Sequence, residues 1–326
     1  NLTSVTFAEG SQLTCIGIYA FNNCKKLTEV VLPNSLTNIG ASAFSYSGLT
    51  EIELPNSLTS IGNNAFSGCT GLTEIELPTS LTNLGGAAFS RCTGLTNLKV
   101  AEGNAKYYAE GNCIIETASK KLVLGCKTSV IPNDVTSIGQ GAFSGCTGLI
   151  NLKVAEGNTK YYADGNCLIA KETSTLLIGL PTSVIPNGVT TISSTAFYGC
   201  KGLTEINIPA SVTKIENGYY DDWDCVYYGA FANCTNLTKV TFAQGSQLTS
   251  IGDLAFYNCS KLAEIEISAS VTSIGRAVFY GCTGLTEIEL PASVTKIENG
   301  YYDDWDEEYY GAFESCTNLT SVTFAE

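Results

Sequence analysis

The sequence predicts a solenoid, in which short repeats stack so that their strands form parallel sheets. Two observations carry this prediction: a phenylalanine recurs at intervals built on a unit of about 23 residues, and each unit contains one stretch that alternates like a half-buried strand. By length alone, 326 residues would suggest about two globular domains. A core of stacked rungs can grow without splitting, so we expect a single solenoid over residues 1–326. The recurring residues are Phe21, Phe44, Phe66, Phe89, Phe143, Phe197, Phe231, Phe256, Phe279 and Phe313.

One regular unit, residues 72–94, shows the elements in order. Its apolar residues over 72–77 alternate as in a strand with one face buried, and Pro78 follows where the strand should stop because proline cannot donate to a ladder. Leu81 and Leu84 form a second apolar pair before a glycine turn. The apolar residues over 88–92 are spaced as in a short helical or 3₁₀ turn that buries one side. Each rung is therefore expected to contribute one parallel strand and one such turn.

The unit pattern LxxIxLPxSLTxIGxxAFxxCxxL resembles that of the BspA-like leucine-rich repeat family, a bacterial cell-surface type with a 23-residue repeat. The resemblance covers essentially the whole chain. It implies a leucine-rich repeat solenoid with an extracellular or cell-surface location. It also implies adherence to host extracellular proteins.

Most of the 14 cysteines occupy one position of the repeat, three residues after the phenylalanine. Equivalent side chains of stacked rungs point the same way, which is poor geometry for a disulfide, and no CxxC pair occurs. We therefore favour a buried ladder of free thiols over a disulfide or metal scaffold. The ladder residues are Cys24, Cys69, Cys92, Cys146, Cys200, Cys234, Cys259, Cys282 and Cys316.

Two long insertions, near 102–130 and 156–184, each contain an apolar run, a polar turn and a second apolar run. This order predicts a β-hairpin that thickens the solenoid with extra rungs. The paired tyrosines Tyr107, Tyr108, Tyr161 and Tyr162 offer aromatic contact area as an alternative. The expected hairpins pair 112–116 with 121–126, and 166–170 with 176–180.

Two shorter insertions, near 216–229 and 298–311, occupy the same phase of the repeat. Each contains four tyrosines, one tryptophan and three aspartates, and we expect both to leave the same side of the solenoid, roughly 15 Å apart. They could cover the solenoid with aromatic rings, form a protein- or glycan-binding patch, or bind Ca²⁺, although no spaced D-x-D-x-D-G pattern occurs. The candidate binding residues are Tyr219, Tyr220, Asp221, Asp222, Trp223, Asp224, Tyr301, Tyr302, Asp303, Asp304, Trp305 and Asp306.

The outward positions of the predicted strands are acidic in two blocks, separated by a neutral to basic middle. Stacked carboxylates about 5 Å apart repel by only roughly 0.8 kcal/mol in water, so a solvated face tolerates them. The alternative is a docking face for a basic partner. The acidic positions are Glu51, Glu53, Glu74 and Glu76 in the first block, and Glu264, Glu266, Glu287 and Glu289 in the second.

Composition excludes several classes of function. The chain has no histidine, which removes Ser–His–Asp and Cys–His catalysis and His-ligated zinc. With 17 Lys and Arg against 31 Asp and Glu, the net charge is −14, which disfavours nucleic acid. The sequence contains no run of 18 apolar residues, so it predicts no membrane span. It also contains no nucleotide-binding or hydrolase motif.

We therefore expect a non-catalytic surface module that binds an extracellular protein or glycan through its solenoid face and its aromatic, acidic loops. The alternative is a structural spacer or stalk that displays another domain. We assign no cofactor and no metal, with calcium at the acidic loops as the weaker option. Residues 1–9 are identical to residues 318–326, so both ends fall within a repeat. This predicts a fragment of a longer array whose exposed end rungs could associate end to end.

Overall fold

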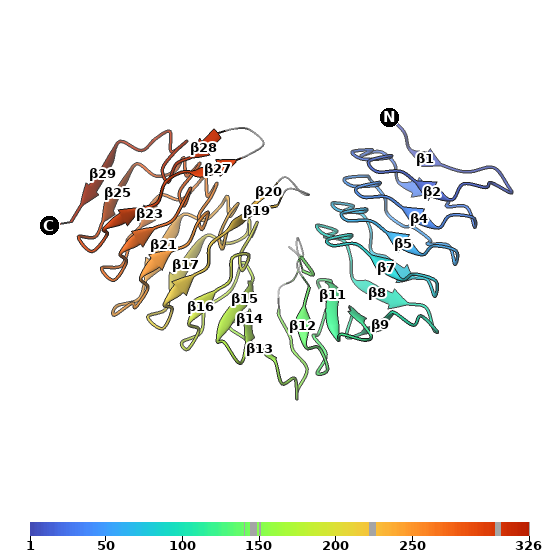
Figure 1. Cartoon of the computed structure of the whole chain (residues 1–326), viewed down its shortest axis with the longest axis horizontal. Helices are drawn as coiled ribbons and strands as arrows, with labels where there is room; N and C mark the ends of the chain where they lie inside the picture. Colours follow the sequence, from blue (N-terminus) through green and yellow to red (C-terminus); the bar gives the residue numbers. More distant parts are fainter. Residues whose placement is uncertain (140, 144–148, 150, 222–225, 304–307, 326) are drawn as a thin grey trace. The chain divides into compact units, whose positions relative to one another are not determined.

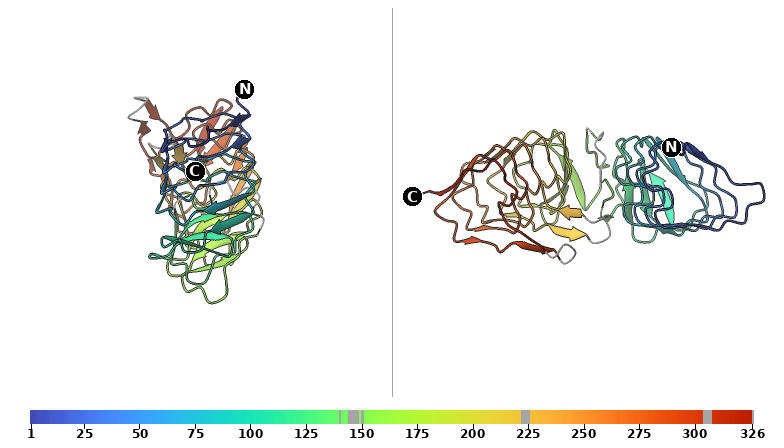
Figure 2. Two further views of the ribbon diagram at one scale, coloured as in Figure 1. Left: turned by 90° about the vertical axis from the view of Figure 1, so that its right-hand side faces the viewer. Right: turned by 90° about the horizontal axis from the view of Figure 1, so that it is seen from above.

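A computed structural model describes residues 1–139, 141–143, 149, 151–221, 226–303 and 308–325. The chain divides into two compact units (Figure 1). Unit 1 comprises Asn1–Leu149 and Lys153–Lys160, and unit 2 comprises Ile150–Leu152 and Tyr161–Glu326. Within each unit the rungs follow one another along the chain, as Figure 2 shows from two further directions. That the two units form one continuous solenoid stays a prediction.

Unit 1 is built from parallel sheets followed by one mixed sheet. The parallel pairs are β1 (Ser4–Val5) with β3 (Glu29–Val30), and β6 (Glu74–Leu77) with β8 (Asn97–Val100). A third parallel sheet has the order β2 (Cys15–Ile16), β4 (Asn38–Ile39), β5 (Ser60–Ile61) and β7 (Asn83–Leu84). The mixed sheet has the order β12 (Ser137–Ile138), β11 (Lys121–Gly125), β10 (Cys113–Glu116) and β9 (Tyr107–Glu110).

Unit 2 repeats this arrangement and adds two hairpins. Its mixed sheet has the order β13 (Tyr161–Asp164), β14 (Cys167–Ala170), β15 (Thr175–Gly179), β16 (Thr191–Ile192) and β18 (Lys214–Ile215). The parallel sheets are β17 (Glu205–Ile208), β21 (Lys239–Phe242) and β23 (Glu264–Ile265); β22 (Ser250–Ile251), β24 (Ser273–Ile274) and β26 (Lys296–Ile297); and β25 (Glu287–Leu290) with β29 (Ser321–Phe324). The hairpins are β19 (Tyr219–Asp221) with β20 (Val226–Tyr228), and β27 (Tyr301–Asp303) with β28 (Glu308–Tyr310).

The predicted repeats with parallel strands are confirmed, and a regular repeat contributes two strands rather than one. In β6 the side chains of Ile75 and Leu77 are buried while Glu74 and Glu76 face solvent, as the alternation predicted. The second residue of the apolar pair that follows each strand lies in a further, two-residue strand such as β5, whereas the first residue, here Leu58, precedes that strand. These second strands align in register, for example Ile39 with Ile61, because identical repeats place identical residues side by side.

The turn that contains the repeat phenylalanine consists of β-turns, where the sequence predicted a helical or 3₁₀ turn. Backbone amides along the turn alternate between hydrogen bonds to the neighbouring rung and hydrogen bonds within the turn. Phe44 N donates to Ala65 O of the next rung at 2.7 Å, and Ser45 N donates to Ser42 O of the same turn at 3.2 Å. Ser42 and Tyr46 have positive φ angles of 52° and 55°, which no right-handed helix accommodates. The turns thus exchange hydrogen bonds with neighbouring rungs and help to hold the stack together.

The core contains a spine of stacked phenylalanine rings and a parallel ladder of thiols. Successive rings, such as Phe44 and Phe66, lie with centroids 5.3 Å apart and nearly parallel. The Cys69 thiol donates to the carbonyl of Phe44 at 3.2 Å, and the same bond recurs in later rungs, for example from Cys259 to Phe231 at 3.1 Å. The predicted ladder of buried free thiols is confirmed where the structure describes it. Cys24 and Cys200 are only partly buried.

Both long insertions form the predicted antiparallel hairpins, β10–β11 and β14–β15, and each gains a third strand at its outer edge, β9 or β13. A glycine in the last strand of each insertion makes room for the next phenylalanine of the spine. A Cβ at Gly125 would lie 2.2 Å from the Phe143 ring, and one at Gly179 would lie 2.0 Å from the Phe197 ring. The glycines thus let the spine resume after each insertion.

Candidate binding surface

The first short insertion folds as the hairpin β19–β20, with tyrosines on both faces. Tyr219 pairs with Tyr228 across the strands, and Tyr220 pairs with Tyr227, so the two pairs point to opposite sides of the hairpin. The ring centroids within these pairs are 5.3 and 4.7 Å apart. Tyr228 also packs on Tyr198 of the preceding rung at 4.6 Å. The hairpin is therefore held against the turns of unit 2 by ring contacts.

The opposite face of this hairpin joins the second one through further tyrosines. Tyr227 stacks on Tyr257 at 5.0 Å, and Tyr257 stacks on Tyr280 at 4.9 Å. Tyr310 of the hairpin β27–β28 meets Tyr280 and Tyr227 edge-on at 5.0 and 5.5 Å. The hairpins lie along one edge of unit 2 (Figure 1). Their closest rings, Tyr227 and Tyr310, are nearer to each other than the roughly 15 Å that the rung spacing predicted for the two insertions, because the tyrosine side chains contact each other above the intervening turns. Beneath the rings lie Leu254 and Ala277.

We call these residues the tyrosine surface: Tyr198, Tyr219, Tyr220, Tyr227, Tyr228, Tyr257, Tyr280 and Tyr310. Apart from Tyr310, which is 8% exposed, they are half-buried. Rings that are already packed lose little conformational entropy when a partner covers them. The surface thus combines partly covered rings with remaining accessible area, which suits an interface.

The structure places part of the predicted binding set. Tyr219 and Tyr220 belong to the tyrosine surface, and Asp221 ends β19. Tyr301, Tyr302 and Asp303 form β27. Six predicted residues lie outside the described ranges, and the calcium alternative for the acidic loops falls on them: Asp222, Trp223, Asp224, Asp304, Trp305 and Asp306.

Six members of this surface were not among the predicted site residues. Tyr227, Tyr228 and Tyr310 lie within the predicted insertions, and a repeat comparison could have found the other three. Tyr198, Tyr257 and Tyr280 each directly follow a spine phenylalanine. In three rungs of unit 1 the same repeat position is serine, buried in the turns at Ser45, Ser67 and Ser90, and in the first rung it is Asn22. In three rungs of unit 2 this position is tyrosine, and each of these tyrosines contacts a tyrosine of a hairpin.

A polar groove of about 250 Å³ lies at the base of the first hairpin and was also not predicted. Residues from successive rungs of the second-strand sheet line it, among them Asn217, Asp253, Arg276 and Glu298. Asp253 and Arg276 follow the glycine of their rungs, where unit 1 has uncharged residues such as Asn63 and Gly86. Sequence reasoning missed the groove because its charges converge only when the rungs stack.

The outward carboxylates of both units are exposed, as the strand alternation predicted. Two of them pair with lysines of a neighbouring rung: Lys99 lies 2.8 Å from Glu74, and Lys239 lies 2.5 Å from Glu264. Hydrogen bonding to the ammonium of Lys99 lowers the pKa of Glu74. Solvent screens such exposed pairs and they contribute little to stability, so the faces are largely solvated carboxylate rows.

The thiols of the core have low reactivity. Burial raises the pKa of the Cys113 thiol to about 12 and that of Cys167 to about 11. Partial burial is enough to raise the pKa of the Cys200 thiol to about 12 as well. Because the thiolate is the reactive form, these groups are inert near neutral pH. Among the residues that the structure describes, no group of three cysteine or acidic side chains gathers in a way that could hold a metal ion.

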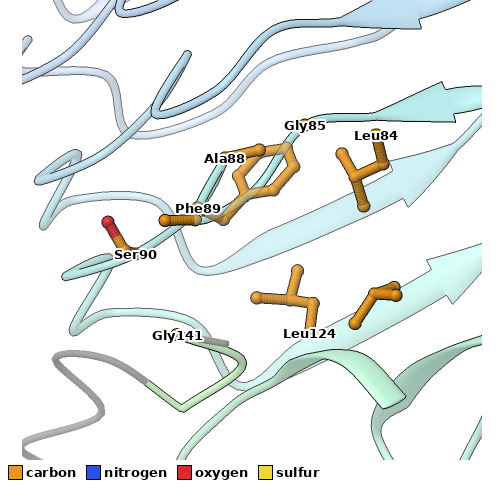
Figure 3. Close-up of a pocket in the computed structure, with 9 residues that line it drawn as sticks. Leu84, Gly85, Ala88, Phe89, Ser90, Leu124 and Gly141 are labelled. Atoms are coloured by element: carbon orange, nitrogen blue, oxygen red, sulfur yellow. The ribbon is translucent and has the colours of Figure 1, made fainter. Parts of the chain in front are cut away.

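A second hollow lies in unit 1 beside Phe89, bounded by Leu84, Leu124 and Gly141 (Figure 3). Its volume of about 10 Å³ would hold a single water molecule at most, since one water needs roughly 10–15 Å³ by this measure. It is therefore no ligand site. Within the described ranges we find no helix with the length and apolar character needed to cross a bilayer.

Within each unit, repeats of short parallel strands joined by stacked turns define a solenoid protein. A family model described as "BspA type Leucine rich repeat region (6 copies)" matches residues 1–113, 122–171 and 177–305. The chain therefore belongs to the BspA-type leucine-rich repeat family, and the resemblance seen in the repeat pattern is confirmed.

Solved structures agree with this assignment. A leucine rich cell surface protein from Faecalibacterium prausnitzii A2-165 is 28% identical, with a TM-score of 0.61 over 96% of this chain and 77% of that one. The pneumococcal vaccine antigen PcpA, at 19% identity, shares the fold with a TM-score of 0.54 over 99% of this chain and 72% of that one. A leucine-rich repeat protein from Eubacterium ventriosum ATCC 27560 does so at 21% identity, with a TM-score of 0.50 over 99% and 84%. Comparison with curated proteins gave no match.

Proposed function

We propose that the protein is a non-catalytic binding or adhesion module of the cell surface. In this proposal it recognises an extracellular protein or glycan through the tyrosine surface and the acidic loops of unit 2, with the strand face as a secondary contact. The tyrosine surface is the observation that carries the proposal, because packed but accessible tyrosines are favoured at recognition surfaces. The family and the printed name of the F. prausnitzii relative support the surface location.

The test is an array of glycans and extracellular-matrix proteins, probed with the wild type and with a variant that lacks residues 217–228 and 299–310. We expect the wild type to bind and the deletion variant to lose binding. A second variant, Tyr219→Ser with Tyr220→Ser, keeps the hairpins and should weaken binding as well. The matched control is Tyr19→Ser, which changes a 61% exposed tyrosine in unit 1. Running the array with and without calcium tests the metal alternative.

Unchanged binding by both hairpin variants would rule out the loops as the site and leave the strand face. Charge reversal of Glu51 and Glu53 would then be the next test, because a basic partner should respond to it and to salt. Absence of binding by the wild type to every array member favours the alternative function, a spacer or stalk that displays another domain.

A further inference from the structure

We propose that the polar groove of unit 2 binds a neutral pyranose unit of a glycan. The inference rests on the proposed binding function and deepens it, because it names a ligand class and a specific pocket beside the tyrosine surface. The residues that carry it are Asn217, Ser250, Asp253, Ser273, Arg276 and Glu298.

The floor of the groove supplies neutral hydroxyl groups. Ser250 and Ser273 begin the adjacent parallel strands β22 and β24 and align in register, so both belong to the lining of the same groove. A hydroxyl both donates and accepts hydrogen bonds, as the hydroxyls of a sugar do. Ile251 adds an apolar element to the lining.

The Asp253 carboxylate is held in one orientation before any ligand arrives. Its Oδ1 accepts a hydrogen bond from Arg276 N at 2.7 Å, and its own backbone amide donates to Asn217 Oδ1 at 3.2 Å. Gly275 packs directly against it, since a Cβ there would lie 2.7 Å from Oδ1. The Asp253 side chain is 17% exposed. An acceptor fixed in this way binds a hydroxyl without a further loss of side-chain conformational entropy.

Charge and size select the ligand class. The groove combines two carboxylates, Asp253 and Glu298, with one guanidinium, Arg276, whose Nε lies 3.9 Å from Asp253 Oδ2. Lys296 Nζ lies 2.7 Å from Glu298 Oε1, so the two carboxylates are balanced by two cations. A groove without net charge does not favour acidic sugars or phosphates, while the mixture of donors and acceptors suits vicinal hydroxyls. A volume of about 250 Å³ is below the roughly 300 Å³ where pockets for drug-sized ligands begin, so it suits one small ring.

The groove also adjoins the tyrosine surface along the chain. Asp253 and Arg276 are followed directly by Leu254 and Ala277, which lie beneath the tyrosine rings. Gly218 joins the groove to the hairpin: its amide donates to Asp253 O at 2.7 Å, and a Cβ there would lie 2.8 Å from the same oxygen. A glycan that places one sugar in the groove can therefore meet aromatic rings with its next sugars.

Unit 1 offers a matched control for this site. Asn63 Oδ1 accepts a hydrogen bond from Gly86 N at 2.9 Å, the same backbone device that Asp253 makes with Arg276. Neither residue is charged, so the device by itself is structural. The groove differs from its counterpart by the charges that the proposal invokes.

The experiment is saturation-transfer NMR with the methyl glycosides of glucose, galactose, mannose and N-acetylglucosamine, followed by titration. We expect at least one glycoside to bind the wild type. Asp253→Asn should weaken binding by roughly tenfold or more, because one charge-assisted hydrogen bond is lost. Arg276→Gln, at a residue whose side chain is 51% exposed, should weaken it several-fold without affecting the fold. Asn63→Ala should leave the affinity unchanged.

Absence of binding by all four glycosides overturns the proposal, as does equal affinity in the wild type, Asp253→Asn and Arg276→Gln. Calcium titration is run in parallel, and calcium binding that Asp253→Asn abolishes, without any glycoside signal, would reassign the groove to a cation. Tyr219→Ser with Tyr220→Ser separates this inference from the proposed function. It should weaken macromolecular binding on the array yet keep the glycoside signal.

Discussion

The two long insertions share one fold but differ in one polar cluster. Both consist of three antiparallel strands, β9–β11 and β13–β15, with the same register irregularity at Ile114/Ile115 and at Leu168/Ile169. In the first insertion Tyr108, Lys120 and Asp134 come together, and the residues 54 positions later are Tyr162, Ser174 and Gly188. Side chains that both insertions share are therefore the ones that their common fold requires, whereas side chains found in only one insertion are not needed to form it.

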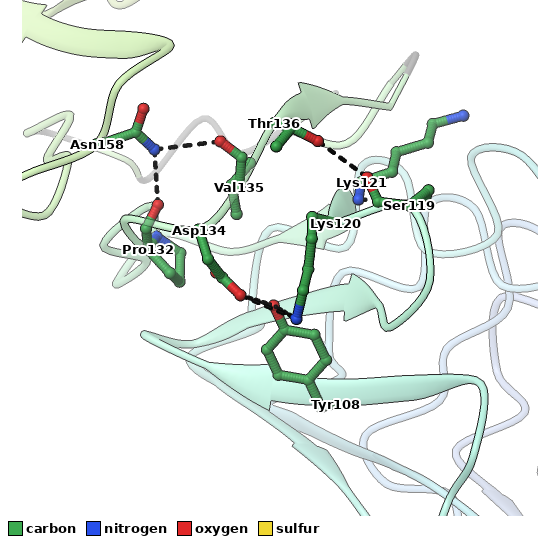
Figure 4. Close-up of polar contacts among 9 residues, drawn as sticks. All are labelled: Tyr108, Ser119, Lys120, Lys121, Pro132, Asp134, Val135, Thr136 and Asn158. Carbon is green, nitrogen blue, oxygen red and sulfur yellow. Dashed lines mark hydrogen bonds and ion pairs between the residues drawn. The ribbon is translucent and has the colours of Figure 1, made fainter.

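The cluster of the first insertion is compact (Figure 4). Tyr108 Oη donates to Asp134 Oδ2 at 2.7 Å, and Lys120 Nζ lies 3.0 Å from the same oxygen and 4.5 Å from the centre of the tyrosine ring. Burial, reinforced by the hydrogen bond to Asp134, raises the pKa of Tyr108 to about 12. The hydrogen bond from Tyr108 in turn lowers the pKa of Asp134. Because the second insertion folds without this cluster, we infer that the cluster adds stability but does not direct the fold.

The largest effect should come from a shared residue, the asparagine that ties each insertion to the preceding repeat. Asn158 Nδ2 donates to the carbonyls of Pro132 and Val135 at 2.7 and 3.3 Å (Figure 4), and Asn104 makes the equivalent bonds. Alanine at either position should cost about 3 kcal/mol in the free energy of unfolding, since two carbonyls lose their donor. Urea denaturation measures it. A difference above about 1 kcal/mol between the two variants would show that the insertions are not anchored alike.

The next effect should come from the glycines that admit the spine rings. Gly125→Ala and Gly179→Ala each place a methyl group against a phenylalanine ring, Phe143 or Phe197. Overpacking of this kind costs about 1–3 kcal/mol, and we expect both variants to fall in that range. Thermal unfolding followed by circular dichroism measures it. The control is Gly103→Ala, where no atom lies within 4 Å, although its φ of 90° adds strain of its own. A smaller loss in Gly125→Ala than in Gly103→Ala would contradict the steric explanation.

These positions also show what sequence reasoning could and could not reach. The hairpins and the thiol ladder were predictable because apolar alternation and the repeat phase fix them, as at Cys69. The second strands were missed because two residues, such as Ser60–Ile61, are too short to show an alternation. The β-turns were missed because the positive φ of Ser42 occurs at a residue that is not glycine. The groove was missed because Asp253 and Arg276 meet only across rungs.

A smaller effect should separate the two insertions. Tyr108→Phe removes one hydrogen bond to Asp134 and should cost about 1 kcal/mol, whereas Tyr162→Phe should cost close to nothing because glycine occupies the position of that carboxylate. The stability that Tyr108 contributes is present below its ordinary pKa near 10 and is lost as pH rises toward 12. The part that depends on ionised Asp134 is lost as pH falls through its lowered pKa. Equal losses in the two variants at pH 7 would contradict the role of the cluster.

The smallest net effect should come from moving the cluster into the second insertion by Ser174→Lys with Gly188→Asp. The new side chains would restore the pairings of Lys120 and Asp134, with a gain of at most about 1 kcal/mol because such pairs are half-exposed. Gly188 has a φ of 105°, which an aspartate adopts only with strain of similar size. We therefore expect a net change within about 0.5 kcal/mol in urea denaturation. A gain near 1 kcal/mol would instead mean that the backbone at residue 188 relaxes and that side chains alone distinguish the two insertions.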